Sequence, residues 1–476
     1  MANFSNYGDH DATGLAELVR NGEVTETELL DEALARARRL QPELNAVTAE
    51  MEDEARRAIA DGLPDADFRG VPFMLKDLHV LYNGSPTHNG CRYYHDYVAD
   101  HDSEIVVRFK RAGLVTMAKS NTPEFGLCAS TEPVSHGPAP NPWDLSRSGG
   151  GSSGGSATAV AAGIVPVAHA TDGGGSIRIP ASCCGLVGLK TTRGRNPTGP
   201  DALESLHGIG HVVSRSVRDS ARMLDCIAGP DFGAPFGTLP APSSFAGQVS
   251  TPPGRLRIAF TTRVPEGVAL DPVCAEAVER VVDVLGSLGH VVEEAAPDIP
   301  HDFVASFWRM FASVGAHANL AARVAATGRA LTEDDVEPVT WEAYQRGARV
   351  PAPELHTGIQ RVHLMARQVA LFHRDWDLLL SPTLAQRPVP LGYLSMNVVD
   401  VEGYWERLFG FIPYTPVQNL TGQPAISLPL HWSGDGLPVG VQFSAPFGDE
   451  ATLLRIAGQL EDAMPWADRR PPVHAG

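Results

Sequence analysis

Residues 149–156 read Gly-Gly-Gly-Ser-Ser-Gly-Gly-Ser, and residues 171–176 read Thr-Asp-Gly-Gly-Gly-Ser. Each stretch is a glycine-rich loop that carries a serine, and Ser152 and Ser176 lie 24 positions apart. Glycine-rich backbone approaches a ligand closely and turns several N–H groups toward one point, as is needed to hold an oxyanion beside a serine nucleophile. The two loops therefore predict an enzyme.

Helix and strand signals precede the loops. A capping box at Thr25 predicts an amphipathic helix that Pro42 ends, and residues 48–61 predict a second helical stretch. Residues 70–75 predict a short buried strand that delivers Lys76 at its C-terminal end. Active groups of open α/β sheets often lie at this end of a strand.

The same alternation continues through the rest of the chain. A helix is predicted over 157–163 and a strand over 164–168, between the two serine loops. Residues 229–254 form a connection rich in Pro, Gly and Ser, about 300–375 is mostly helical, and 376–381 returns to a buried strand. We expect one α/β domain over residues 1–476, whose final third rejoins the same sheet.

Composition excludes several classes of protein. The chain has 476 residues and a net charge of −18, and its 38 basic residues are scattered, which disfavours nucleic acid and anionic membranes as partners. The N-terminus lacks the pattern of a signal peptide, and no apolar run of membrane-spanning length occurs. Six cysteines without a Cys-x-x-Cys pair are typical of reduced thiols, so the expected location is the cytoplasm.

The first loop also matches other patterns. Gly149, Gly151 and Gly154 fit a dinucleotide-binding fingerprint, but no buried strand precedes them, so they do not close a βαβ unit. A phosphate-binding P-loop is excluded because neither loop ends in Gly-Lys-Ser/Thr. Taken alone, the segment fits a flexible linker and a catalytic loop about equally well.

The second loop and Lys76 decide between these alternatives. Together with the first loop they resemble the signature of the amidase signature family of serine hydrolases, and the resemblance spans most of the chain. Its motifs are residues 70–77, 119–126, the two serine loops, 185–190, 419–425 and 436–443. The resemblance implies an α/β fold with a large mixed β-sheet core flanked by helices on both faces.

The resemblance also implies a Ser-cisSer-Lys triad. Ser176 is then the nucleophile, Ser152 the bridging serine that relays the proton, and Lys76 the base. A serine hydroxyl needs a neighbouring base, and a lysine that follows a buried strand is desolvated, which favours its neutral amine. Ser153 is the neighbouring candidate for the bridging role, but the spacing to Ser176 favours Ser152.

Further site residues follow from the second loop. The oxyanion hole is expected to consist of the backbone N–H groups of Gly173, Gly174, Gly175 and Ser176. Many family members carry Asp-Thr-Gly-Gly-Ser here, and the additional glycine removes a side chain, so we expect a wider site for bulkier acyl groups. Supporting roles or substrate contacts are assigned to Gly151, Ser153, Asp172 and Arg178.

Histidine and metal chemistry are disfavoured. The chain has 17 histidines, of which His169 lies nearest Ser176 in the sequence, but no Gly-x-Ser-x-Gly elbow accompanies them. No His-Glu-x-x-His or similar ligand spacing is present. We therefore expect neither a metal nor an organic cofactor.

Substrate preference is indicated by aromatic residues and by the second loop. Aromatic side chains cluster at Phe303, Phe307, Trp308 and Phe311, and again at Tyr393, Tyr404, Trp405, Phe409, Phe411 and Tyr414. Several of them at a pocket would favour apolar or aryl amides. Residues 170–185 are similar to the family branch that contains 6-aminohexanoate cyclic dimer hydrolase and amidases of anilides and carbamates.

The expected function is hydrolysis of C–N bonds in neutral or hydrophobic linear, aryl or cyclic amides, with carbamates, urethanes and nylon-type oligomers as further substrates. The expected partner is a small-molecule amide, and a homodimer is left open. An amidotransferase A-type subunit that works with partner subunits is one alternative. A non-catalytic binding relative is another, although the presence of Lys76, Ser152 and Ser176 together argues against it.

Overall fold

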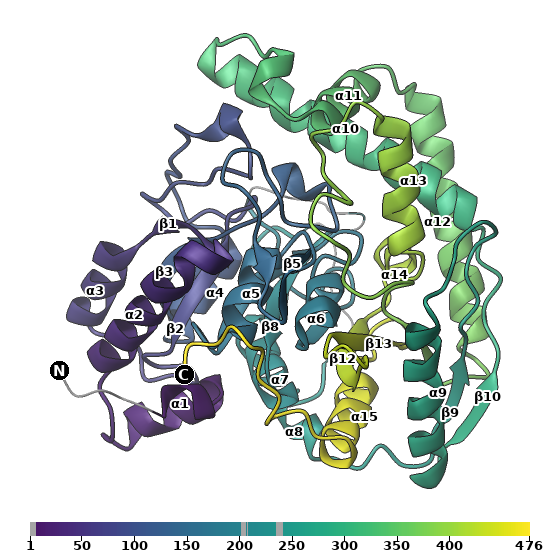
Figure 1. The fold of residues 1–476 in the computed structure, drawn as a ribbon, viewed down its shortest axis with the longest axis horizontal. Coiled ribbons are helices and arrows are strands. Elements are labelled where there is room, and N and C mark those ends of the chain that lie inside the picture. The colour runs from purple at the N-terminus through teal and green to yellow at the C-terminus, as the bar shows by residue number, and fades with distance from the viewer. Residues whose placement is uncertain (1–5, 201–205, 207, 235–240) are drawn as a thin grey trace.

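A mixed sheet of 11 strands crosses the described part of the molecule (Figure 1). The structure, a computed structural model, describes residues 6–200, 206, 208–234 and 241–476. From one edge to the other, the strands are β1 (Val47–Glu50), β3 (Val115–Ser120), β2 (Pro72–Lys76), β6 (Val167–Asp172), β8 (Ile209–Ser214), β7 (Val187–Lys190), β12 (Ala425–Trp432), β13 (Pro438–Ser444), β11 (Leu378–Pro382), β9 (Arg257–Phe260) and β10 (Val291–Glu294). A separate two-stranded sheet pairs β4 (Pro140–Asn141) with β5 (Asp144–Ser148).

Parallel pairing occurs at two places in the sheet. β2 runs parallel to β3 and β6, and β9 runs parallel to β10 and β11, while the other neighbours are antiparallel. β7 pairs with β12, with Lys190 opposite Ala425. The final third of the chain therefore rejoins the sheet formed by the first half, as the sequence predicts.

Helices cover both faces of the sheet. They are α1 (Ala12–Arg20), α2 (Glu26–Leu44), α3 (Glu52–Asp61), α4 (Glu104–Arg111), α5 (Gly154–Ala161), α6 (Arg178–Cys184), α7 (Val217–Ile227), α8 (Ala246–Val249), α9 (Pro272–Ser287), α10 (His301–Thr327), α11 (Pro338–Gly347), α12 (Ala352–Phe372), α13 (Val401–Phe411), α14 (Thr415–Thr421) and α15 (Glu450–Ala463). Ile426 and Leu428 of β12 pack in one apolar cluster with residues of α9 and α15. On the opposite face, Gln442 of β13 accepts a hydrogen bond from Arg178 of α6. Alternation along the strands thus separates two helical layers.

A group of helices stands above one end of the sheet. α10, α11, α12 and α13 gather at the upper right of Figure 1, in the green part of the chain. The region around 300–375 accordingly contains three long helices and the short helix η4 (Glu333–Asp335). No helix among the described residues is long and apolar enough to cross a membrane.

Several predicted boundaries differ in the structure. The strand predicted over 164–168 lies at Val167–Asp172 as β6, because pairing with β8 continues to the second glycine loop. α2 continues through Pro42 to Leu44, since Leu40 and Leu44 are buried, and Asn45 ends it in the left-handed conformation. The helix predicted over 48–61 is divided, because β1 pairs with β3 before α3 begins. In the predicted connection over 229–254, residues 246–249 form α8, while the part over 235–240 lies outside the described residues.

Packing of α15 on α8 predicts a stability effect. A Cβ added at Gly458 would lie 2.1 Å from the backbone oxygen of Val249. We expect Gly458→Ala to lower the free energy of unfolding by about 1–3 kcal/mol, since rigid backbone must move. Gly286→Ala in α9 is the control, because its Cβ meets no atom within 4 Å. Urea unfolding measures both, and equal stability of the two variants would contradict this packing.

Candidate active site

Lys76 lies at the carboxyl end of β2 and is completely buried. Its Nζ is 2.6 Å from Ser152 Oγ and 2.8 Å from Thr171 Oγ1. Burial lowers the pKa of Lys76 well below its ordinary value, although the Asp172 carboxylate opposes this shift. The neutral amine is therefore favoured, and its lone pair can accept a proton from Ser152.

The first glycine loop turns Ser152 toward Lys76. The Gly151–Ser152 peptide bond is cis. A Cβ at Gly151 would lie 2.7 Å from backbone atoms of Cys128, Ala129 and Ser130, so only glycine fits there. Ser153 has a different position, because its Oγ lies 3.3 Å from both the backbone N and O of Thr171. Ser152 is thus the serine that faces the amine.

The second glycine loop is held by its carbonyl groups. The Gly173 carbonyl accepts from Trp308 Nε1 at 2.9 Å, and the Gly174 carbonyl accepts from Thr415 Oγ1 at 2.7 Å. The Gly175 N–H donates to Asp172 Oδ1 at 2.7 Å. This bond occupies one of the four N–H groups expected in the oxyanion hole.

The other three N–H groups of the expected set, those of Gly173, Gly174 and Ser176, have no acceptor among the residues the structure describes. Ser176 follows directly and is 9% exposed. Ser152, Ser176, Gly173 and Gly174 all line one cavity of about 430 Å³. The cavity therefore brings two serine hydroxyls together with backbone donors, which is the set of groups that acyl transfer requires.

A buried ion pair supports the second loop. Arg178 Nε lies 2.9 Å from Asp172 Oδ2, and both side chains are completely buried. Asp172 also accepts from the N–H groups of Gly175 and Ile177. Burial would raise the pKa of Asp172, but the Arg178 guanidinium and the Asn419 amide hold it at about 2. The carboxylate is therefore ionised and fixes the turn of the loop.

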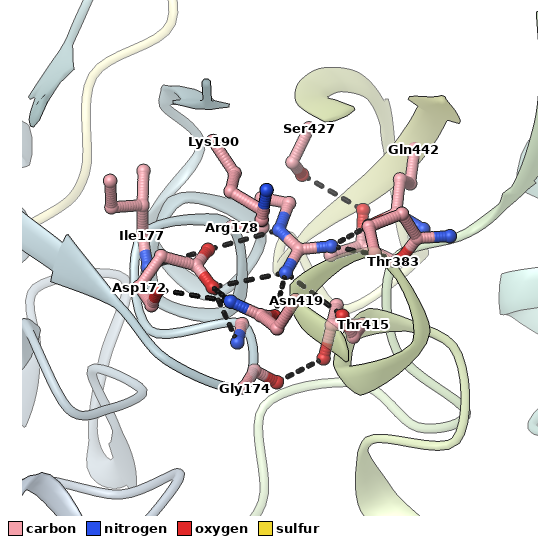
Figure 2. A network of polar contacts seen from close by, with 12 residues as sticks. Asp172, Gly174, Ile177, Arg178, Lys190, Thr383, Thr415, Asn419, Ser427 and Gln442 are labelled. Carbon is pink, nitrogen blue, oxygen red and sulfur yellow. Dashed lines mark hydrogen bonds and ion pairs between the residues drawn. The ribbon is translucent and has the colours of Figure 1, made fainter. Parts of the chain in front are cut away.

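Arg178 connects this loop to the C-terminal part of the chain. Figure 2 shows its guanidinium between Asp172, Asn419 and Gln442. It donates to Asn419 Oδ1 at 2.6 Å, to Gln442 Oε1 at 2.7 Å and to the Thr415 carbonyl at 2.9 Å. Thr415 in turn donates to the Gly174 carbonyl. Asp172 and Arg178 thus support the loop, and Arg178 itself does not line the cavity.

The cavity wall is mostly apolar. One face of α10 contributes Trp308, Phe311, Ala312, Gly315, Ala316 and Asn319. The remaining apolar side chains include Leu78, Val80, Ile105, Phe125, Leu127 and Ile209. The α10 residues recur at helical spacing, which the sequence shows. This spacing does not predict which face of the helix lies toward Ser152 and Ser176.

The predicted aromatic residues have different positions. Trp308 and Phe311 line the cavity, while Phe303 and Phe307 line another cavity beside α12. Trp405 and Phe409 pack edge-on against Trp308 and form a layer behind it. The rest of the predicted aromatic residues, Tyr393, Tyr404, Phe411 and Tyr414, do not line the serine cavity.

Trp308 packs against the second glycine loop. The threonine of Asp-Thr-Gly-Gly-Ser aligns with Gly173, so the wider site stays a prediction, whereas a Cβ at Gly174 would lie 2.8 Å from Trp308 Nε1. The indole therefore takes the space that a side chain on the loop would occupy. The sequence did not identify the supporting groups Thr171, Thr415, Asn419 and Gln442, although the last two lie within its C-terminal motifs.

His169 does not line the serine cavity. It lies on β6, completely buried, and its ring packs edge-on against Phe109. Both ring nitrogens are without a hydrogen-bond partner within the described ranges. A histidine triad with Ser176 is therefore not supported.

The ion pair leads to a prediction about stability. Arg178→Met leaves the Asp172 carboxylate buried without its cation, so we expect a loss of about 3–5 kcal/mol in the free energy of unfolding. Asp172→Asn combined with Arg178→Met should recover part of the loss, since no uncompensated charge stays buried.

The matched control is Arg346→Met, which removes a half-exposed pair with Glu342 and should cost at most about 1 kcal/mol. Urea unfolding at neutral pH measures all three variants. A loss in Arg178→Met no larger than in Arg346→Met would contradict the supporting role of the buried pair.

Comparisons with known proteins agree with this geometry. Residues 28–454 match the family model "Amidase". The chain is 41% identical to the 6-aminohexanoate-cyclic-dimer hydrolase of Pseudomonas sp. (strain NK87) over 479 residues, which covers 97% of this chain and 96% of that protein.

Solved structures give the same result. The structure of 6-aminohexanoate cyclic dimer hydrolase superposes with a TM-score of 0.91 at 38% identity, covering 98% of this chain and 99% of that one. A bacterial aryl acylamidase of the amidase signature family superposes with a TM-score of 0.88 at 25% identity, covering 96% and 97%. The chain belongs to the amidase signature family and hydrolyses amide carbon–nitrogen bonds.

Proposed function

We propose that the chain hydrolyses neutral amides through an acyl-enzyme on Ser176, with Lys76 as base and Ser152 as proton relay. The observation that carries this proposal is the buried Lys76 amine, 2.6 Å from Ser152 Oγ, beside a cavity that Ser152 shares with Ser176. Because burial lowers the pKa of Lys76, the amine can take a proton at ordinary pH. No metal or organic cofactor takes part in this reaction.

Acylation begins when Ser176 Oγ attacks the amide carbon. The Ser176 proton passes to Ser152, and the Ser152 proton passes to Lys76. The N–H groups of Gly173, Gly174 and Ser176 stabilise the negative oxygen of the tetrahedral intermediate. The intermediate collapses as the C–N bond breaks, and the relay returns a proton to the departing amine.

Deacylation repeats these steps with water as the nucleophile. Water loses its proton through Ser152 to Lys76 while it attacks the acyl carbon, and a second tetrahedral intermediate forms at the same N–H groups. Breakdown of this intermediate returns a proton to Ser176 Oγ and releases the carboxylic acid. One amide and one water molecule thus give one acid and one amine.

The cavity supports neutral substrates with an apolar acyl or amine group. Its one charged lining residue among the described ones is Asp172, whose charge is matched by Arg178. The names of the similar proteins, a cyclic dimer hydrolase and an aryl acylamidase, support cyclic and aryl amides. Carbamates are further candidates, since their cleavage uses the same oxyanion stabilisation and protonation of the leaving group.

The cytoplasm is the proposed location. All six cysteines are free thiols, which supports a reducing compartment such as the cytoplasm. A homodimer stays a prediction.

A hydrolysis panel tests the proposed function. The purified single chain is assayed with aryl anilides, aliphatic amides, cyclic amide dimers and carbamates, and we expect neutral aryl or cyclic amides to be cleaved. Ser176→Ala should lower kcat by at least about a thousandfold, because it removes the nucleophile. The exposed Ser287→Ala is the serine control and should be unaffected.

Intact-mass measurement after a brief reaction should find an acyl adduct in the wild type and none in Ser176→Ala. Undiminished hydrolysis by Ser176→Ala would refute the assigned nucleophile. A folded single chain that cleaves no substrate of the panel would instead favour the amidotransferase subunit or the non-catalytic relative.

The lowered pKa of Lys76 predicts the pH profile. Protonation removes the base, so kcat/KM should fall on the acid side of the lowered pKa and stay constant above it. The plateau should include pH values at which an ordinary lysine, with a pKa of about 10.4, is still protonated. The measurement uses a substrate without titratable groups, and Lys76→Met should be inactive throughout. An activity limb centred near pH 10.4 would contradict a neutral Lys76.

A further inference from the structure

Three histidines line a separate cavity of about 420 Å³, and neither Ser152 nor Ser176 is among its lining residues. Its wall is formed by the loop after β2, the 3₁₀-helix η2 (Arg92–Tyr94), the loop after η3 (Glu124–Gly126), and η4. The lining residues include His88, His95, His136 and Asp334. This cavity takes no part in the amide chemistry proposed above.

His88 is oriented by a buried carboxylate. Its Nδ1 lies 2.7 Å from Asp77 Oδ2, and Asp77 also accepts from the backbone N–H of His88 and from Thr48 Oγ1. Because an ionised carboxylate only accepts, Nδ1 carries the proton and Nε2 keeps its lone pair. Metal-binding histidines usually have this second contact with a carboxylate, which fixes the tautomer and raises the basicity of the ligand nitrogen.

His136 has the same tautomer for a different reason. Its Nδ1 lies 2.9 Å from Ser135 Oγ, and Ser135 gives its only hydroxyl proton to the Gly90 carbonyl at 2.7 Å. His136 must therefore donate from Nδ1, which leaves Nε2 as an acceptor. His95 donates from Nδ1 to the Arg92 carbonyl at 3.0 Å, so its Nε2 also keeps a lone pair.

The imidazole rings of His88 and His136 lie close together. The ring centroids of His88 and His136 are 5.2 Å apart, and one ligand atom from each of Asp77, His88 and His136 lies within 4.8 Å of the others. Two nitrogens of a tetrahedral zinc site are about 3.3 Å apart, given Zn–N bonds of about 2.0–2.1 Å. Ring nitrogens of His88 and His136 within 4.8 Å of each other are therefore near the separation that a shared ion requires.

We propose that His88 and His136 bind a divalent transition-metal ion such as Zn²⁺ through their Nε2 atoms. Water completes the coordination, and His95 and Asp334 line the same cavity. Imidazole nitrogen favours Zn²⁺, Co²⁺, Ni²⁺ or Cu²⁺, whereas Mg²⁺ and Ca²⁺ prefer oxygen ligands. The sequence did not predict this site because its ligands come from separate loops.

The charges around the cavity permit a cation. Arg92 and Arg329 also line it, but Arg329 Nη2 lies 3.5 Å from Asp335 Oδ1 and its guanidinium stacks on Tyr93. Arg92 donates to the Val336 carbonyl. The lining thus holds two guanidinium groups and the carboxylates of Asp334 and Asp335, and the Asp77 carboxylate lies behind His88. A bound ion would fasten the loop after β2 to the loop after η3, and would therefore raise thermal stability.

Metal titration tests the site directly. The full chain, without a polyhistidine tag and dialysed against a chelator, is titrated with Zn²⁺ and separately with Mg²⁺ in a calorimeter. We expect one Zn²⁺ site and no Mg²⁺ binding. His88→Gln and His136→Gln should each raise the Kd for Zn²⁺ by about tenfold or more. The control is His363→Gln, which removes an exposed histidine of α12 and should leave the Kd unchanged.

A second measurement distinguishes loss of the metal site from misfolding of a variant. Circular dichroism first establishes that each metal-free variant unfolds cooperatively, and Zn²⁺ should then raise the Tm of the wild type and of His363→Gln but not of His136→Gln. If His88→Gln is unfolded, His136→Gln carries the test by itself. Failure of the wild type to bind Zn²⁺, or equal affinity in the wild type and His136→Gln, would overturn the proposal.

Discussion

The Asp172–Arg178 ion pair is the constraint on which the site depends. Both side chains are completely buried, so the pair must recover the free energy lost when two charges leave water. It does so through hydrogen bonds with the second glycine loop, α14 and β13. These contacts fix the loop so that the Gly173 and Gly174 carbonyls accept from Trp308 and Thr415. The N–H groups of Gly173, Gly174 and Ser176 are thereby left without an acceptor among the described residues, as the proposed oxyanion hole requires.

Burial determines the direction of the Lys76 pKa shift, against the effect of Asp172. Asp172 raises the pKa of Lys76, but burial has the larger effect and lowers it. The Asp172 carboxylate is matched by Arg178, and Lys76 contacts two hydroxyl groups instead of a carboxylate. An amine in this environment is most stable when neutral. Arg178 and Lys76 thus differ, because Arg178 keeps its charge in a paired geometry while burial shifts the pKa of Lys76 downward.

α10 has two functions in the fold. One of its faces closes the serine cavity with Trp308 and Phe311, and the other contributes Phe303 and Phe307 to the cavity beside α12. Trp308 in addition donates to the second glycine loop. One indole therefore contacts both the cavity and the loop, and it fills the space beside Gly174.

The sequence by itself determined the alternation of helices and strands in an α/β domain, the strand that ends at Lys76, and the order of the motifs that carry Ser152 and Ser176, while the mixed sheet was implied by the family resemblance. Local patterns and spacing are enough for these features, because they depend on neighbouring residues and on chain order. Tertiary structure alone decided that α2 continues through Pro42, that Gly175 donates to Asp172, and that Trp308 fills the space beside Gly174. It also decided which histidines share a cavity, since His88 and His136 meet only when separate loops pack together. Contacts of this kind depend on packing between distant segments, and no periodicity in the sequence records them.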